Sequence, residues 1–265
     1  MKKFTIITGL IASLLFYACQ DYESVVSYTP VTEDHYEGTL LEFLSDKSAD
    51  RSGHTFDSML IIIDAIPGLR EELEKEDGYF TLFAVPDECF ERSFKQLNAY
   101  RANKNLGGEV SLDDLLVEPF TVEDTIINNR GDRIDTLITR YNYDYRAQLD
   151  SLFCRYIFTG MNDTKKILGE DDHSLSVESL KNRYQMNMAC HFLPSSGIVS
   201  GGTMAFKFSD MNESKLSERW ETTDVIQHDI YAHNAVIHII TEQHTFGFDK
   251  FIYYFKNRGN EYEKE

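Results

Sequence analysis

Apolar residues recur at helical spacing through much of the first half of the chain. The clearest case places four of them at positions i, i+3, i+4 and i+7: Phe56, Met59, Leu60 and Ile63. This spacing predicts a helix with one buried face, which Pro67-Gly68 ends. Similar patterns predict helices in residues 39–44, 87–97 and 149–157, the last closed by Gly160. We expect Asp87 to cap the helix over residues 87–97, because an aspartate is a favoured N-cap residue.

The hydrophobic period changes to two in the second half. Every second residue from 184 to 192 is apolar: Tyr184, Met186, Met188, Cys190 and Phe192. This alternation is typical of a half-buried strand. Residues 204–208 repeat it, and residues 79–85 and 236–240 form short apolar runs of strand length. Helices early and strands late predict a single α+β domain.

The first 19 residues combine a positive start with an apolar run that ends at a cysteine. Lys2 and Lys3 precede 15 uncharged residues, and Ala18 stands directly before Cys19. A run of this length is too short to cross a bilayer as a helix. The pattern predicts a bacterial lipoprotein signal peptide over residues 1–18, with lipid attached to Cys19. The alternative is an ordinary secretory signal in which Cys19 is coincidental.

The residues after the cysteine bear on where such a lipoprotein would lie. Residues 19–37 are acidic and lack periodicity, so they read as a tether. Gln20 stands where an aspartate would be the familiar signal for retention in the inner membrane. We therefore expect a cell-envelope lipoprotein on the outer membrane of a Gram-negative bacterium, exposed at the surface and held by its acyl chains.

The net charge narrows the range of partners. The chain carries a formal charge of −18, and removing residues 1–18 takes away two lysines and no acid. A surface this acidic argues against nucleic acid, since binding phosphates needs a clustered cationic face. It also argues against docking on anionic lipid head groups, so the lipid itself must provide the membrane contact.

Three segments of the sequence resemble the signatures of fasciclin-like domains. Thr81-Leu-Phe-Ala-Val-Pro-Asp-Glu-Cys-Phe90 is similar to the first signature, and Asn234-Ala-Val-Ile-His-Ile-Ile240 is similar to the last. Between them, Leu152–Gly160 resembles the central helix-and-turn motif. The Tyr-His pair of that central motif is Arg155-Tyr156 here, so a role of the family histidine does not transfer.

The resemblance implies a fold and a class of function. It implies one fasciclin-like domain over residues 38–248, with helices packed on a β-sandwich core and a C-terminal extension over residues 249–265. The extra length of this chain falls near residues 100–148 and 195–222, which we interpret as insertions. Members of the family are mainly extracellular adhesion modules, or modules that bind proteins and glycans, rather than enzymes.

The first insertion holds the candidate ligand-binding residues. Arg130-Gly131-Asp132 is an integrin-type tripeptide at the expected tip of a hairpin, although ordinary turn chemistry explains it equally well. Tyr141, Tyr143 and Tyr145 alternate with polar residues, so three rings could share one strand face. Packing against the domain and stacking on a sugar are the two interpretations of those rings.

Other polar clusters give no sign of a catalytic, metal or cofactor site. His228, His233 and His238 are spaced five apart, which points neighbouring members to opposite faces of a strand. His238 matches the histidine of the last family signature and is expected to be structural. The three cysteines after Cys19 sit in apolar patterns and are expected to be buried free thiols.

The sequence thus predicts a lipid-anchored, non-catalytic adhesion or interaction module whose protein or glycan ligand is unknown. The alternative is a glycan-binding accessory lipoprotein of an outer-membrane nutrient-uptake system. An enzyme such as a glycosidase ranks third, because no nucleophile, metal or acid-base signature stands out.

Overall fold

The two segments that resemble the first and last fasciclin-like signatures lie side by side in the fold. In the computed structural model, which describes residues 34–50, 53–75, 77–130 and 133–261, β2 (Phe80–Ala84) pairs in parallel with β10 (Ala235–Ile240). The register places Leu82 opposite Ile237 and Phe83 opposite His238. Every residue of both strands is buried. The expectation that the two signatures contribute to one core is therefore confirmed.

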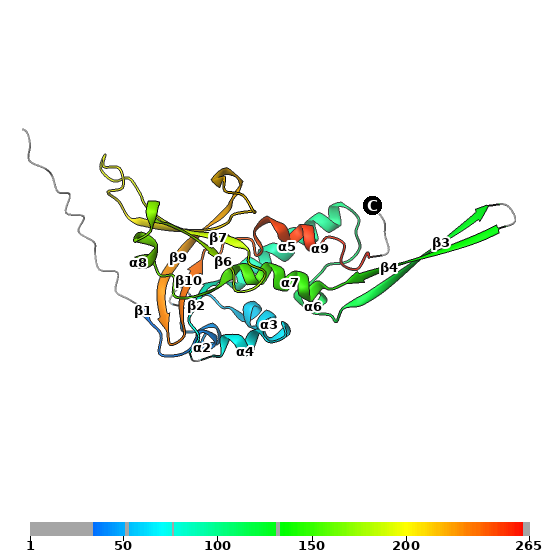
Figure 1. Ribbon diagram of the computed structural model, residues 1–265, viewed down its shortest axis with the longest axis horizontal. Coiled ribbons are helices and arrows are strands. Elements are labelled where there is room, and N and C mark those ends of the chain that lie inside the picture. Colours follow the sequence, from blue (N-terminus) through cyan, green and yellow to red (C-terminus); the bar gives the residue numbers. More distant parts are fainter. Residues whose placement is uncertain (1–33, 51–52, 76, 131–132, 262–265) are drawn as a thin grey trace, which may run out of the picture. The chain divides into compact units, whose positions relative to one another are not determined.

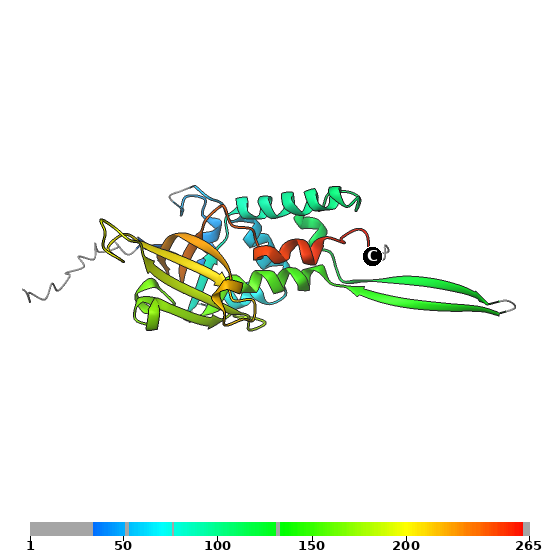
Figure 2. The same cartoon turned by 90° about the horizontal axis from the view of Figure 1, so that it is seen from above.

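The main sheet is continuous in the described part of the chain. Its strand order is β5-β2-β10-β9-β8-β7-β6, and a short β1 pairs in parallel with β9. The remaining strands are β1 (Asp34–His35), β5 (Ile157–Thr159), β6 (Ser174–Glu178), β7 (Gln185–Phe192), β8 (Met204–Asp210) and β9 (Glu221–Ala232). The α+β class is confirmed. Instead of a sandwich of two stacked layers, one sheet curves around on itself (Figure 2), as the twist of successive strands allows.

The helices occupy the segments before β2, between the strands and after β10. They are α2 (Leu40–Ser45), α3 (Asp57–Ala65), α4 (Leu69–Leu73), α5 (Asp87–Asn103), α6 (Leu112–Leu115), α7 (Tyr145–Phe153), α8 (Thr164–Leu168) and α9 (Phe251–Phe255). Helices α5, α7 and α9 run alongside one another beyond one end of the sheet (Figure 2). The helix expected to reach residue 157 is shorter, because α7 gives way to the 3-10 turn η1 (Cys154–Tyr156) and then to β5.

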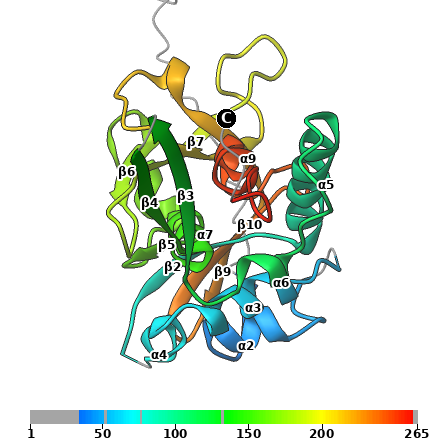
Figure 3. The same ribbon diagram turned by 90° about the vertical axis from the view of Figure 1, so that its right-hand side faces the viewer.

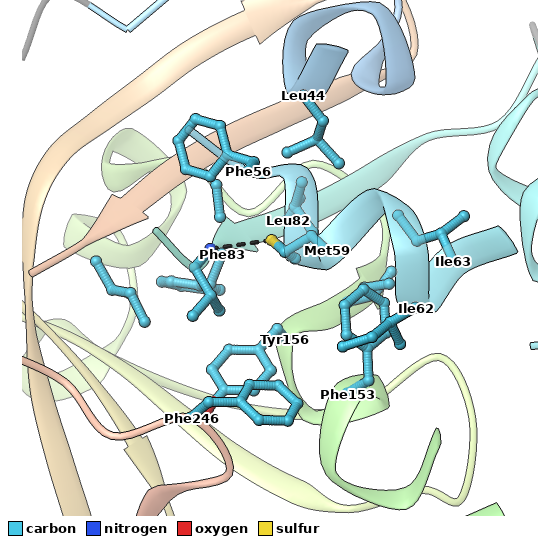
Figure 4. Packing of buried hydrophobic residues seen from close by; sticks show 14 of the residues in the cluster. Leu44, Phe56, Met59, Ile62, Ile63, Leu82, Phe83, Phe153, Tyr156 and Phe246 are labelled. Carbon is cyan, nitrogen blue, oxygen red and sulfur yellow. Dashed lines mark hydrogen bonds between the residues drawn. The ribbon is translucent and has the colours of Figure 1, made fainter. Parts of the chain in front are cut away.

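One hydrophobic core joins the helices to the sheet. Figure 4 shows Met59 of α3 beside Phe83 of β2, with Tyr156 and Phe246 packed below them. The Phe83 ring stacks on Phe208 of β8 at a centroid distance of 3.8 Å. The Met59 sulfur accepts the backbone N–H of Val85 at 3.0 Å, which ties α3 to the end of β2 (Figure 4). Helix faces and strand faces that are distant in sequence thus exclude water from the same interior.

Asp87 caps a helix, but not the helix that was expected. The Asp87 carboxylate accepts the backbone N–H groups of Asp57 at 3.0 Å and Ser58 at 2.7 Å, and the Thr55 hydroxyl at 2.6 Å. It therefore caps α3, whose own N-cap residue, Phe56, makes no side-chain capping bond. Helix α5 starts at Asp87 itself, after Pro86. The residue serves a helix end about 30 positions earlier in the chain, which spacing alone does not reveal.

Several expected segment boundaries also differ. Asp34–His35, within the expected tether, forms β1, and Tyr36 continues this contact by donating its backbone N–H to the Tyr231 carbonyl at 2.8 Å. The expected second insertion contains β8, which lies between β7 and β9 in the main sheet. The expected C-terminal extension contains α9, whose Phe251 and Phe255 are buried in the core. Apolar burial, rather than position relative to the signatures, decides what belongs to the domain.

Candidate functional site

A hairpin within the first insertion stands apart from the main sheet. It consists of β3 (Phe120–Arg130) and β4 (Arg133–Tyr143), paired in unbroken register from Phe120 opposite Tyr143 to Arg130 opposite Arg133. Within the described residues, these two strands pair only with each other. The ribbon extends away from the helices and the sheet (Figures 1 and 2). The predicted hairpin is confirmed, and eleven residues a strand correspond to about 35 Å of length.

Aromatic packing fixes the root of the hairpin, which emerges beside α6 and α7 (Figure 3). The Phe120 ring stacks on Tyr143 at 5.6 Å, and Tyr143 stacks on Tyr145 at 6.1 Å. The Tyr145 hydroxyl donates to the Glu261 carboxylate at 2.9 Å, and the Tyr143 hydroxyl donates to the Glu261 carbonyl at 3.1 Å. The Arg258 guanidinium lies 5.2 Å from the Tyr145 ring centroid. The C-terminal segment thus holds the base of the ribbon in place.

The three candidate tyrosines do not form one exposed platform. Strand β4 ends at Tyr143, and Asp144 caps α7 by accepting the backbone N–H of Ala147 at 2.9 Å. Tyr145 is therefore the first residue of a helix, where its side chain is only 3% exposed. Tyr141 remains 39% exposed, opposite Val122 in the register. Only Tyr141 offers a substantially exposed ring, because Tyr143 and Tyr145 are engaged at the root.

The outer part of the ribbon exposes aliphatic side chains instead. Leu137 is 56% exposed and Ile138 is 52% exposed. They are consecutive residues of one strand, so they lie on opposite faces of the ribbon. The sequence reading missed both residues. The available signal was the loss of strict alternation in β4, where two aliphatic residues stand next to each other in a segment predicted to be an exposed hairpin.

Two other predicted sites lie partly or wholly outside the described residues. Arg130 ends β3, while Gly131 and Asp132 of the tripeptide lie outside the described part of the chain. Cys19, the predicted lipid attachment residue, and the signal peptide also lie outside it. Within the described ranges, no helix combines the length and apolar character needed to cross a bilayer.

The histidine of the last signature occupies a structural position in the core, as predicted. His238 lies at a β-bulge, where β9 presents two residues opposite it. Its Nδ1 accepts the backbone N–H of Asp229 at 3.2 Å, so its Nε2 carries the proton that it donates to the Asn162 carbonyl at 3.1 Å. Burial lowers the pKa of His238 to about 4. The neutral ring satisfies a backbone N–H that the bulge leaves without a strand partner.

A second histidine is also held neutral in the interior. His244 Nε2 lies 2.7 Å from the Tyr156 hydroxyl, which accepts the backbone N–H of Gly247 at 2.8 Å. Burial lowers the pKa of His244 to about 3, which keeps the imidazole neutral. Among the described residues, no three histidine, cysteine or acidic side chains form a group that could hold a metal ion.

The three cysteines of the domain are buried free thiols, as their apolar surroundings predict. Burial raises the pKa of Cys89 and of Cys190 to about 12, and that of Cys154 to about 11. A thiol that resists deprotonation is a poor nucleophile and a poor metal ligand. These residues therefore act as small core side chains.

Among solved structures, the chain is similar to the FAS1 domain pair from the insect cell adhesion molecule fasciclin I. The similarity covers 81% of this chain and 52% of that chain, with a TM-score of 0.45 and 11% sequence identity. The chain thus spans about half the length of the structure that it matches. No family model matches the chain, and no curated protein matches it.

Proposed function

We infer that this chain is a non-catalytic interaction module of the bacterial cell envelope, attached through lipid on Cys19 and contacting a protein partner through the β3–β4 hairpin. The signal-like residues 1–19 support the anchor. The resemblance to fasciclin-like signatures supports an adhesion-type role. The observation that carries the role of the hairpin is the exposure of Leu137 and Ile138 on opposite faces of a projecting ribbon.

The chemistry of the ribbon favours a protein over a glycan as its partner. Aliphatic side chains gain free energy when an apolar surface covers them, and sugar hydroxyls provide little such surface. A sugar platform would need exposed aromatic faces, whereas the Tyr143 and Tyr145 rings stack on each other at the root. A two-stranded ribbon also offers free backbone groups along both outer edges, to which a partner strand can add.

A second function, the glycan-binding accessory of a nutrient-uptake system, draws support from another part of the molecule. A polar concavity there is lined by charged, amide and aromatic side chains, including Arg155, Tyr184 and Asp210. The identity of the neighbouring genes would distinguish between the two functions. Adjacent transporter and glycoside-hydrolase genes would favour the accessory role, and their absence would favour adhesion.

The anchor is tested by metabolic labelling with palmitate. We expect the full-length protein to incorporate label in a bacterial host and the Cys19→Ala variant to incorporate none. Equal labelling of the variant would contradict lipidation and leave the ordinary secretory signal as the explanation of residues 1–19.

The hairpin is tested by site-specific photo-crosslinking on intact cells. A crosslinker at position 137 or 138 should trap a discrete protein, and one at exposed Leu216 should not. The trapped protein is then purified and its affinity measured for the Leu137→Ser/Ile138→Ser double variant. The matched control replaces two other exposed aliphatic residues, Leu216→Ser/Ile226→Ser. If the control loses binding and the hairpin variant binds like wild type, the proposed role of the hairpin is wrong.

A further inference from the structure

Four segments that are distant in sequence converge on a small concavity. It is lined by Arg155 of η1, Tyr184 just before β7, Asp210 at the end of β8 and Lys250 of η4 (Phe248–Lys250), and its volume is about 260 Å³. The wall is completed by Gln185, the first residue of β7, and by four residues of the two turns beside these strands: Asn182, Arg183, Asn212 and Glu213. Pockets for drug-sized ligands span roughly 300–1,000 Å³, so this one suits a smaller molecule.

The floor of the concavity is a buried group of charges. Arg155 is 3% exposed, and its Nε donates to the Asp210 carboxylate at 2.9 Å. Its Nη1 donates to the Ser151 carbonyl, and its guanidinium carbon lies 3.6 Å from the centroid of the Tyr184 ring. The Tyr184 hydroxyl is in turn bonded to the Ser151 hydroxyl at 2.6 Å. The guanidinium is therefore fixed in orientation before any ligand arrives.

The charges in this group do not balance. Lys250 Nζ also donates to Asp210 Oδ2, at 2.9 Å, so two cations share one carboxylate. The other oxygen of Asp210 accepts the backbone N–H of Asn212 at 2.9 Å. Asp249 lies 3.9 Å from Lys250 Nζ, but its side chain is 65% exposed, so water screens this contact. Counting every residue that lines the concavity, three cations (Arg155, Arg183 and Lys250) stand against two carboxylates (Asp210 and Glu213). The lining thus carries one excess positive charge, on a protein whose net charge is −18.

Two strained turns supply further side chains to the wall. Asn182 and Arg183 have φ values of 61° and 54°, and Asn212 and Glu213 have φ values of 48° and 55°. Consecutive residues in this left-handed region favour glycine at the second position, because a Cβ atom there is unfavourable. The chain instead has Arg183 and Glu213, whose side chains line the concavity. Strain that is retained in this way is typical of functional sites.

We propose that this concavity binds a sugar acid of monosaccharide size, such as a uronate residue of a glycan. The excess cation offers a charge-assisted partner for the carboxylate. The amide N–H groups of Asn182 and Gln185 donate to Cys154 Sγ at 3.3 Å and to the Glu178 carboxylate at 3.0 Å, and their amide oxygens can accept hydrogen bonds from sugar hydroxyls. A neutral sugar would leave the excess positive charge unpaired, so the carboxylate decides specificity. This site is separate in residues from the hairpin, and neither proposal depends on the other.

The test measures calorimetric binding of D-galacturonate, D-galactose and inorganic phosphate to the full-length protein. Galacturonate and galactose differ at the carboxylate, so galacturonate should bind at least about tenfold tighter, the effect expected for one charge-assisted contact. Lys250→Met should weaken galacturonate binding by about tenfold or more. The matched control, Lys207→Met, removes a lysine of β8 that lies outside the concavity and should bind like wild type.

A further variant separates loss of binding from loss of folding. Arg183→Gly relieves backbone strain and removes one cation from the wall, at the expense of an exposed ion pair with Glu178. We expect weaker galacturonate binding with a melting temperature no lower than that of wild type. Three results would each overturn the proposal: equal binding of galactose and galacturonate, tighter binding of phosphate than of galacturonate, or wild-type binding by Lys250→Met. Absence of galacturonate binding to the wild-type protein would also overturn it.

Discussion

Two pairs of strands in this protein share the same kind of backbone pairing and differ in almost everything else. The β2–β10 pair contains the two segments that resemble fasciclin-like signatures and is buried along its whole length in the main sheet. The β3–β4 pair forms a sheet of its own, with Leu137, Ile138 and Tyr141 exposed. Backbone hydrogen bonds alone therefore do not indicate where the free energy of folding comes from, since each contributes only modestly.

This difference in burial between the two strand pairs bears on function. Side chains consumed by the core cannot meet a partner, whereas an isolated two-stranded ribbon is at best marginally stable in water and gains from being covered. The root contacts of Tyr143 and Tyr145 with Glu261 hold this ribbon to the domain without burying its outer part. We therefore expect mutations in the β2–β10 pair to lower stability. Mutations in the outer part of the β3–β4 hairpin should weaken binding and leave stability almost unchanged.

The largest expected effect falls on the signature strands. Phe83→Ala and Ile237→Ala each remove a fully buried side chain, so each should lower the free energy of unfolding by about 2–5 kcal/mol. Leu137→Ala, in the hairpin, should change it by less than about 0.5 kcal/mol. Urea denaturation of the three variants measures the contrast. Equal losses at Phe83 and Leu137 would show that the hairpin is part of the stabilising core.

A slightly smaller effect is expected from pH. His238 and His244 have folded-state pKa values lowered to about 4 and about 3, against about 6.5 in the unfolded chain. Below pH 6.5 the unfolded chain therefore binds protons that the folded chain excludes, and stability falls as the pH drops. The two residues together should cost about 3 kcal/mol between pH 6.5 and pH 5. Well above pH 6.5 both residues are neutral in the folded and the unfolded chain, and the effect vanishes.

The pH dependence also sharpens the comparison, because residues 120–143 contain no histidine. The slope of the free energy of unfolding against pH, measured by denaturation over this range, should stay the same when the outer hairpin is replaced by a short turn. His238→Gln should reduce the slope by about half, since one of two titrating groups is lost. An unchanged slope in that variant would mean that His238 is not buried in the neutral form.

The next effect tests a contact between distant segments of the buried region. Asp87→Ala removes the acceptor for Thr55, Asp57 and Ser58 at the start of α3 and should cost about 1–2 kcal/mol. Glu91→Ala, on the exposed side of α5, is the matched control and should change stability by less than about 0.5 kcal/mol. If both variants have the same free energy of unfolding as wild type, Asp87 does not cap α3 in solution.

The smallest effect on stability is expected in the outer hairpin. The Leu137→Ser/Ile138→Ser variant should melt within about 0.5 kcal/mol of wild type, because both side chains already lie mostly in water. The same variant is expected to lose its protein partner. A large loss of stability would instead indicate that the ribbon folds back on the domain, which would remove the basis for its proposed role.

Local patterns predicted most of the elements because burial on one face leaves a period in the sequence. The alternation over residues 184–192 became β7, and the helical spacing of Phe56, Met59 and Ile63 became α3. The curved sheet and the bulge at His238 depend instead on how distant strands pair. The same is true of Asp87, whose partner Ser58 lies 29 residues away.

Less of the candidate sites could be predicted. The hairpin followed from turn chemistry around Gly131, but the end of β4 did not, and Tyr145 was therefore assigned to the wrong element. The available signal was Asp144, a favoured N-cap residue before an apolar helical pattern. The concavity left no local signal, because Asp210 lies 55 residues from Arg155 and 40 from Lys250. Only the fold brings these charges together.

The short pairing of β1 with β9 also has a mechanical consequence. Asp34 and His35 are held opposite Ile230 and Tyr231, and the next backbone bond joins Tyr36 to Tyr231 at 2.8 Å. Tension that pulls on the chain from its N-terminal side reaches these few bonds before any other part of the sheet. Together with the bond from the His233 backbone N–H to the Gly38 carbonyl at 2.8 Å, their release would free the chain up to α2, adding about 20 Å of reach at roughly 3.4 Å per residue. Because β1 pairs only with β9, this extension would leave the pairing of β2 with β10 in place within the described residues.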